Sequence, residues 1–174
     1  IKLNTNENPY PPAPGVAKAL LSMDMDRLRL YPDPTAGNLV HTLAEYYGVK
    51  DEQVFVGVGS DDVLSMIFLT FFNSKKPILF PDITYSFYKV WADVYRIPFE
   101  TPALDEHFRI VASDYYKENG GVVITNPNAP TSICEGLDFI RDILIHNIDS
   151  IVVVDEAYID FGRETALPLL EEFD

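Results

Sequence analysis

Two short apolar runs constrain the fold of this chain more than any other feature. Residues 121–125 read Gly-Val-Val-Ile-Thr, and residues 151–155 read Ile-Val-Val-Val-Asp. Strands that are apolar at successive positions are buried on both faces, which is typical of parallel sheets covered by helices. Other segments, such as residues 60–72, carry apolar residues at helical spacing. The sequence therefore predicts the α/β class, with a mostly parallel sheet and flanking helices.

The expected elements alternate along the 174 residues. We predict strands at 54–58, 77–80, 97–101, 121–125 and 151–155. We predict helices at 15–23, 60–72, 85–95 and 137–146, and one more helix that ends at Tyr47. Thr35 is expected to cap the helix that ends at Tyr47. Four prolines between Asn8 and Pro14 predict an extended arm. We assign residues 1–34 to an N-terminal arm with a short helix and residues 35–174 to a partial larger domain.

The composition excludes several classes of partner. A net charge of −14 repels nucleic acid and anionic lipid. No apolar run approaches the roughly 18–20 residues that a membrane span needs. Cys134 is the only cysteine, so no intrachain disulfide is possible, which favours a reducing cytoplasm. No metal site is predicted. The chain starts with Ile1 rather than Met, and we expect it to begin inside a longer protein.

Ligands of open parallel sheets bind beyond the carboxyl ends of the strands. Four polar strings stand at such ends: Gly57-Val-Gly-Ser-Asp-Asp, Pro81-Asp-Ile-Thr-Tyr-Ser, Asn126-Pro-Asn-Ala-Pro-Thr and Asp155-Glu-Ala-Tyr. In the first string, the N–H groups of Ser60 and Asp61 and the Ser60 hydroxyl could hold a phosphate at a helix start. An ordinary helix start with Ser60 as its cap is the alternative.

The other three strings offer groups for a flat cofactor. The Tyr85 ring could stack on one, although a half-buried packing tyrosine would look the same. The Asn128 amide can donate in a fixed direction, or belong to a plain surface turn. Asp155 closes a valine-rich strand and stays charged only beside a cation or donors, and a protonated pyridine nitrogen is such a cation. Tyr158 could donate to a phenolate oxygen. A Mg²⁺-binding Asp-Glu pair is the alternative, but no phosphate-loop lysine accompanies it.

In this order, the four strings resemble those of fold-type I aminotransferases that use pyridoxal 5'-phosphate (PLP). The start Asn4-Thr-Asn-Glu-Asn-Pro, the Tyr31-Pro-Asp turn and the string Asp155-Glu-Ala-Tyr-Ile-Asp-Phe narrow the resemblance to the histidinol-phosphate aminotransferase family. It runs along essentially all 174 residues and covers the front half of that family's fold. Two positions depart from the usual Asn-Asn-Pro-Thr-Gly: Ala129 replaces an asparagine and Ser132 replaces the glycine.

The resemblance implies a role for each matched residue. Ser60 and Asp61 would hold the cofactor phosphate, and Tyr85 would stack on the ring. Asn128 and Tyr158 would donate to the 3′ oxygen, and Asp155 would pair with the ring nitrogen. In a homodimer, Tyr31 would reach the phosphate of the partner's cofactor. In the N-terminal arm, Asn8 and Tyr10 would contact the substrate.

The implied reaction is amino transfer between L-histidinol phosphate and 2-oxoglutarate in L-histidine biosynthesis. The family's Schiff-base lysine follows a serine on a later strand, and none of the seven lysines here has that context. We therefore expect the 174 residues alone to be inactive, and unstable or aggregating because inner strands are missing. The alternatives are an aromatic aminotransferase, a threonine-phosphate decarboxylase, and a short non-catalytic protein that binds PLP or a partner.

Overall fold

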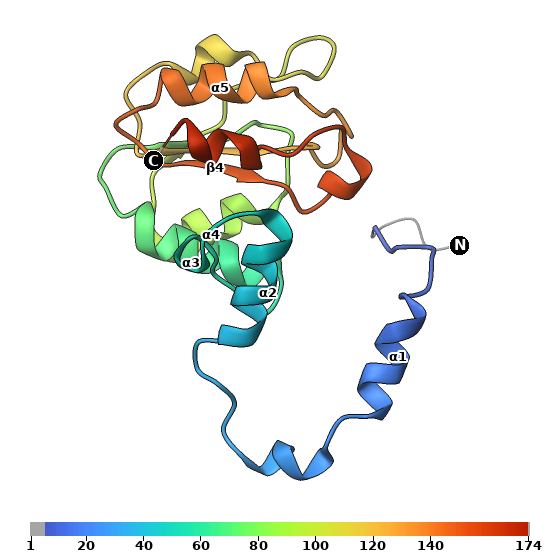
Figure 1. Cartoon of the computed structure of the whole chain (residues 1–174). Helices are drawn as coiled ribbons and strands as arrows, with labels where there is room; N and C mark the ends of the chain where they lie inside the picture. The colour runs from blue at the N-terminus through green and yellow to red at the C-terminus, as the bar shows by residue number, and fades with distance from the viewer. Residues whose placement is uncertain (1–5, 174) are drawn as a thin grey trace. The chain divides into compact units, whose positions relative to one another are not determined.

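The computed structural model describes residues 6–173, and the chain divides into two compact units between Val54 and Phe55. The Asn4-Thr part of the start motif lies outside the described residues. Figure 1 traces the chain from the blue N-terminal unit to the red C-terminus.

The first unit is helical. It holds α1 (Pro14–Leu21), the 3-10 helix η1 (Met25–Arg29), α2 (Gly37–Tyr47) and the 3-10 helix η2 (Asp51–Gln53). Residues 6–13 form neither helix nor strand, as the prolines predict. α1 begins with a proline at its first position, where the missing N–H breaks no helical bond.

The predicted cap of the helix that ends at Tyr47 is wrong. α2 starts at Gly37, and its N-cap residue Ala36 has a left-handed backbone and no side-chain cap. The Asp33 carboxylate takes the capping role, because it accepts hydrogen bonds from the N–H of Gly37 at 2.8 Å and of Thr35 at 3.0 Å. These hydrogen bonds lower the pKa of Asp33, and the bond from the Thr35 N–H contributes most.

The second unit is a three-layer α/β structure. Its four strands are β1 (Ile78–Leu79), β2 (Phe99–Glu100), β3 (Gly121–Thr125) and β4 (Val152–Asp155). They pair in the order β2-β1-β3-β4, and every pairing is parallel. The helices are α3 (Ser60–Phe71), α4 (Phe87–Tyr95) and α5 (Leu137–Ile145), with 3-10 helices η3 (Ala112–Tyr115), η4 (Ile159–Phe161) and η5 (Leu167–Glu171).

Alternation along the strands builds two cores, one on each face of the sheet. Ile78, Phe80 and Val123 pack against side chains of α3 and α4. Val122 and Ile124, which point the other way, pack against α5. In Figure 1, α5 accordingly lies on one side of the strands, and α3 and α4 lie on the other. All five residues of β3 are buried, as a strand covered on both faces requires.

The predicted strand at 54–58 is wrong. Val54 has extended backbone angles, but no described strand pairs with the segment, and Phe55 and Val58 are exposed. The strands at 77–80 and 97–101 exist but are shorter than expected. Pro77 and Pro98 carry no N–H, so neither can donate to the ladder at the start of its strand. Regular pairing covers two residues in each strand.

Candidate functional site

The site is centred on the carboxyl ends of β3 and β4. The register places Thr125 beside Asp155 at the last pair of the two strands. Asp155 is half-buried, and its Oδ1 accepts a hydrogen bond from the Ala157 N–H at 3.1 Å. Its Oδ2 accepts one from the Tyr88 hydroxyl at 2.6 Å. Both carboxylate oxygens are therefore held by donors from the protein.

A chain of hydroxyl groups leads away from Asp155. The Tyr88 hydroxyl lies 2.7 Å from Thr125 Oγ1, which lies 2.9 Å from Thr84 Oγ1. Thr84 in turn donates to Asn128 Oδ1 at 2.7 Å. Burial, followed by the charge of Asp155, raises the pKa of Tyr88 above its ordinary range, so this phenol stays neutral and keeps its hydrogen. The chain connects two of the predicted site residues, Asp155 and Asn128.

Tyr85 and Asp61 are joined directly. The Tyr85 hydroxyl donates to Asp61 Oδ1 at 2.7 Å, across 24 residues of sequence. Burial raises the pKa of Tyr85 to about 12, with Asp61 as the next cause and smaller contributions from Asp155 and Tyr158. Asp61 is therefore in direct contact with the Tyr85 hydroxyl, while Asp155 and Tyr158 affect that hydroxyl only through their charge.

The start of α3 was predicted to hold a phosphate. Its N-cap residue is Gly59, at φ 88, so Ser60 does not cap the helix and its side chain is exposed. The first N–H groups of a helix have no partner within it. A Cβ at Gly57 would lie 2.8 Å from a methyl group of Val63, so this turn depends on glycine. The N–H groups of Ser60 and Asp61 lie at the positions that favour a phosphate.

Asn128 is less free than the sequence suggests. It is buried, and its Nδ2 donates to the Ile83 carbonyl at 3.0 Å and to the Thr131 hydroxyl at 3.1 Å. An amide has two hydrogens, and both are used within the protein. In this arrangement Asn128 has no hydrogen left for a ligand, so it joins loops rather than donating outward.

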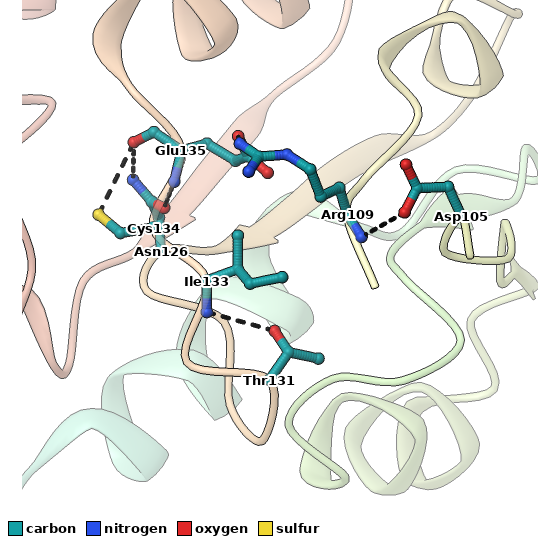
Figure 2. A network of polar contacts seen from close by, with 7 residues as sticks. All are labelled: Asp105, Arg109, Asn126, Thr131, Ile133, Cys134 and Glu135. Carbon is teal, nitrogen blue, oxygen red and sulfur yellow. Dashed lines mark hydrogen bonds and ion pairs between the residues drawn. The ribbon is translucent and has the colours of Figure 1, made fainter. Parts of the chain in front are cut away.

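A clamp closes the loop that carries Asn128. The Asn126 side chain accepts from the Glu135 N–H at 2.7 Å and donates to the Glu135 carbonyl at 3.1 Å. Figure 2 shows this pairing at the base of the loop, with Arg109 reaching the Glu135 side chain from the other side. The Arg109 guanidinium donates to Glu135 Oε2 at 2.5 Å, while Oε1 is buried with no hydrogen-bond partner among the described residues.

We expect Arg109→Met to destabilise the protein by about 1.5 kcal/mol, because a hydrogen bond to a charged group is lost and the Glu135 carboxylate stays buried. The exposure of Arg109 lets water screen part of the effect. Urea denaturation measures the change. Arg141→Met, which breaks exposed pairs with Glu172 and Asp138, is the matched control and should change stability by less. An equal loss in both variants would show that the Arg109–Glu135 pair contributes no more to stability than an exposed ion pair.

The loop also tolerates the departure at Ser132. This residue has φ 63, in the left-handed region that glycine adopts without strain. Its N–H donates to the Asn128 carbonyl at 2.7 Å, and the Asn128 N–H donates to the Ile133 carbonyl at 2.8 Å. The turn therefore keeps a left-handed backbone although a serine stands where the usual pattern has glycine.

Three predicted site residues belong to the first unit. The Tyr31 side chain is fully exposed, and Asn8 and Tyr10 are exposed in the arm. Asn8 Oδ1 accepts a hydrogen bond from the Tyr10 N–H at 2.9 Å, which forms a local turn. The roles predicted for these three residues toward a partner subunit and a substrate stay predictions.

Thr84, Tyr88, Thr125 and the Asn126–Glu135 clamp are not predicted from the sequence. Thr125 carries a usable signal, since a hydroxyl closes an otherwise apolar strand. Tyr88 carries none, because its sequence context resembles that of any core tyrosine on a helix.

Within residues 6–173, no helix is long and apolar enough to span a membrane. The same residues contain no group of three or more acidic, histidine or cysteine side chains that could hold a metal ion.

The chain is similar to known proteins over its whole length. The family model for aminotransferase class I and II matches residues 1–172. A histidinol-phosphate aminotransferase of Lactococcus lactis subsp. cremoris is 55% identical over 174 residues, and one of Pseudomonas putida is 54% identical over the same length. These matches cover all of this chain and 49% and 50% of the two relatives. The chain thus spans about half the length of the curated relatives it matches.

Solved structures agree on the fold. The histidinol-phosphate aminotransferase of Sinorhizobium meliloti, solved in complex with pyridoxal-5'-phosphate, has a TM-score of 0.81 at 21% identity, over 92% of this chain and 45% of that one. A putative histidinol-phosphate aminotransferase from Erwinia carotovora atroseptica has a TM-score of 0.86 at 19% identity, over 97% and 52%. The parallel sheet with flanking helices is part of the PLP-dependent aminotransferase fold, and the chain belongs to the aminotransferase class I and II family.

Proposed function

We propose that this chain is the cofactor-binding portion of a histidinol-phosphate aminotransferase. The observation that carries the proposal is the Asp155 carboxylate at the end of β4, held by two donors near Tyr85 and Tyr158. The identity to curated histidinol-phosphate aminotransferases supports the branch. The reaction proposed for the whole protein is amino transfer between L-histidinol phosphate and 2-oxoglutarate in L-histidine biosynthesis.

The described residues fit the groups of pyridoxal phosphate. The start of α3 offers N–H groups of Ser60 and Asp61 for a phosphate. The half-buried Tyr85 ring, tied through its hydroxyl to Asp61, offers a face for a flat ring. Asp155 offers a carboxylate for a cationic ring nitrogen. For the phenolic oxygen, Tyr158 is the donor that remains, because the Asn128 amide is already engaged.

These residues would act by binding and by electrostatics. The cofactor, when bound, supplies an electron sink beside the carbon that carries the amino group. Asp155 would hold the proton on the ring nitrogen, which strengthens that sink. Each unit by which Asp155 raises the pKa of that nitrogen is worth about 1.4 kcal/mol. A lysine beyond these 174 residues would hold the cofactor and move the substrate proton. The 174 residues alone are therefore expected to be inactive.

Substrate assays of the full-length protein that contains this chain test the proposal. We expect kcat/KM for L-histidinol phosphate, with 2-oxoglutarate as acceptor, to exceed that for phenylalanine by about tenfold or more. Faster turnover of phenylalanine would indicate an aromatic aminotransferase instead. Release of CO₂ from threonine phosphate would indicate the decarboxylase. Absence of any PLP-dependent turnover would favour the non-catalytic binding protein.

The assembly and location are proposed with the function. Tyr31 would contact the cofactor phosphate of a partner subunit in a homodimer, and Asn8 and Tyr10 would contact substrate. Mixing a Tyr31→Phe variant with an Asp155→Asn variant tests the shared site. If each site uses Tyr31 of one subunit and Asp155 of the other, a mixed dimer has one site with neither substitution, so mixing should raise the activity above that of either variant alone. The cytoplasmic location follows from the biosynthetic reaction proposed.

A further inference from the structure

Tyr88 is a buried residue whose hydroxyl group serves no packing purpose. Its exposed fraction is 0%, and its ring packs against Phe68, Phe80 and Tyr85. Phenylalanine would fill the same space. The hydroxyl instead lies 2.6 Å from Asp155 Oδ2 and 2.7 Å from Thr125 Oγ1. A polar group buried this deeply is retained at little energetic cost only where partners satisfy it, and here one partner is a site residue.

The direction of the hydrogen bonds follows from the donors available. An ionised carboxylate only accepts, so Tyr88 spends its single hydrogen on Asp155. The Tyr88 oxygen is then free to accept from Thr125. Thr84 donates to Asn128 Oδ1, so its oxygen is likewise free to accept from Thr125. The single hydrogen of Thr125 has an acceptor on either side, at 2.7 and 2.9 Å.

The two oxygens of Asp155 are held from two different elements. Oδ2 is held by Tyr88 of α4, and Oδ1 by the Ala157 N–H just after β4. With both oxygens engaged, the plane of the carboxylate is fixed. Truncating the Tyr88 hydroxyl would release Oδ2 and let the group rotate about its terminal torsion, which is broad for aspartate. A misaligned carboxylate interacts less well with a charge that has a fixed position.

We propose that Tyr88 is a positioning residue that orients the Asp155 carboxylate toward the ring nitrogen of the cofactor, with Thr125 and Thr84 extending the support to the loop of Asn128. This inference rests on the proposed function. Tyr88 touches neither cofactor nor substrate in this role. It acts through Asp155, so its effect depends on the ring nitrogen being present.

The test compares two ligands on the full-length apoprotein. One ligand is PLP, and the other is its carbon analogue, in which C–H replaces the ring nitrogen. We expect Tyr88→Phe to weaken PLP binding by about tenfold, the order expected for a hydrogen bond to a charged group. Binding of the analogue should stay within about twofold, because Asp155 has no cation to meet there. Fluorescence titration measures both dissociation constants.

Tyr115→Phe is the matched control. Tyr115 is as buried as Tyr88, but its hydroxyl has no hydrogen-bond partner among the described residues, and it lies in the core on the α5 side of the sheet. Its loss should change neither dissociation constant. Thermal melts identify any variant that fails to fold, and Thr125→Val, which removes the hydroxyl group that lies 2.7 Å from the Tyr88 hydroxyl, then replaces Tyr88→Phe with a smaller expected change of the same pattern.

The outcomes separate the inference from the function beneath it. If the unmodified protein fails to bind PLP, the proposed function is wrong. If it binds PLP, but Tyr88→Phe weakens both ligands equally, the hydroxyl has only a structural role and the inference is overturned. Unchanged PLP binding in Tyr88→Phe overturns it as well. A loss confined to the ligand that has a ring nitrogen supports it.

Discussion

Asp155→Asn in the full-length protein is expected to lower the rate of amino transfer by about 10²–10³-fold, the range seen when one preorganised electrostatic group is removed from an active site. The substitution keeps the shape of the side chain and its place at the end of β4. It removes the negative charge that would hold a proton on the ring nitrogen. Single-turnover rates at saturating PLP measure the effect apart from any loss of cofactor.

Asp160→Asn is the control for that experiment. Asp160 lies five residues further along, in η4, and is exposed, so the same change of charge is made there at a position that water reaches. The rate of this variant should stay within about twofold, because water and salt screen an exposed charge. An Asp155→Asn protein that retained half of the unmodified rate would remove the basis for the proposed cofactor pairing.

Gly121→Ala is expected to destabilise the protein by about 3–4 kcal/mol, since overpacking and backbone strain add together. Gly121 opens β3 at φ 145, a conformation that side chains rarely adopt. An added Cβ would lie 2.3 Å from Cε1 and 2.6 Å from Cδ1 of Phe72, which is itself buried. Urea denaturation of the full-length protein measures the loss.

Two further variants separate the causes. Gly15→Ala lies in α1, where a Cβ would meet nothing within 4 Å, and it should stabilise the protein by up to about 1 kcal/mol. Adding Phe72→Leu to Gly121→Ala should recover part of the loss by relieving the clash, although the backbone strain remains. A Gly121→Ala protein as stable as the parent would show that β3 shifts freely at its start.

The parts of the fold that could be predicted are those that local pattern decides. β3 was predicted at its observed bounds and β4 within one residue, because runs of valine and isoleucine are buried on both faces between clear boundaries. The segment 54–58 has the same local pattern but no pairing strand among the described residues. Strand pairing depends on residues that are far away in the sequence, so local composition alone cannot predict it.

The candidate site divides in the same way. Asp61, Tyr85 and Asp155 could be expected near one another because each follows a predicted strand, and the carboxyl ends of parallel strands share one edge. The hydroxyl chain could not be expected. The contact between Tyr88 and Asp155 spans 67 residues of sequence, and that between Thr84 and Asn128 spans 44. Such contacts depend on rotamers and on helix position, which no spacing in the sequence encodes.

The strand order β2-β1-β3-β4 has a consequence for biosynthesis. A ribosome releases β1 first, and both β2 and β3 add directly to it, one on either side. β4 then adds to β3, so each new strand meets an edge that already exists. Each strand after β1 pairs with a strand that was synthesised earlier. This part of the sheet can therefore grow outward during translation, before the residues that follow it are synthesised.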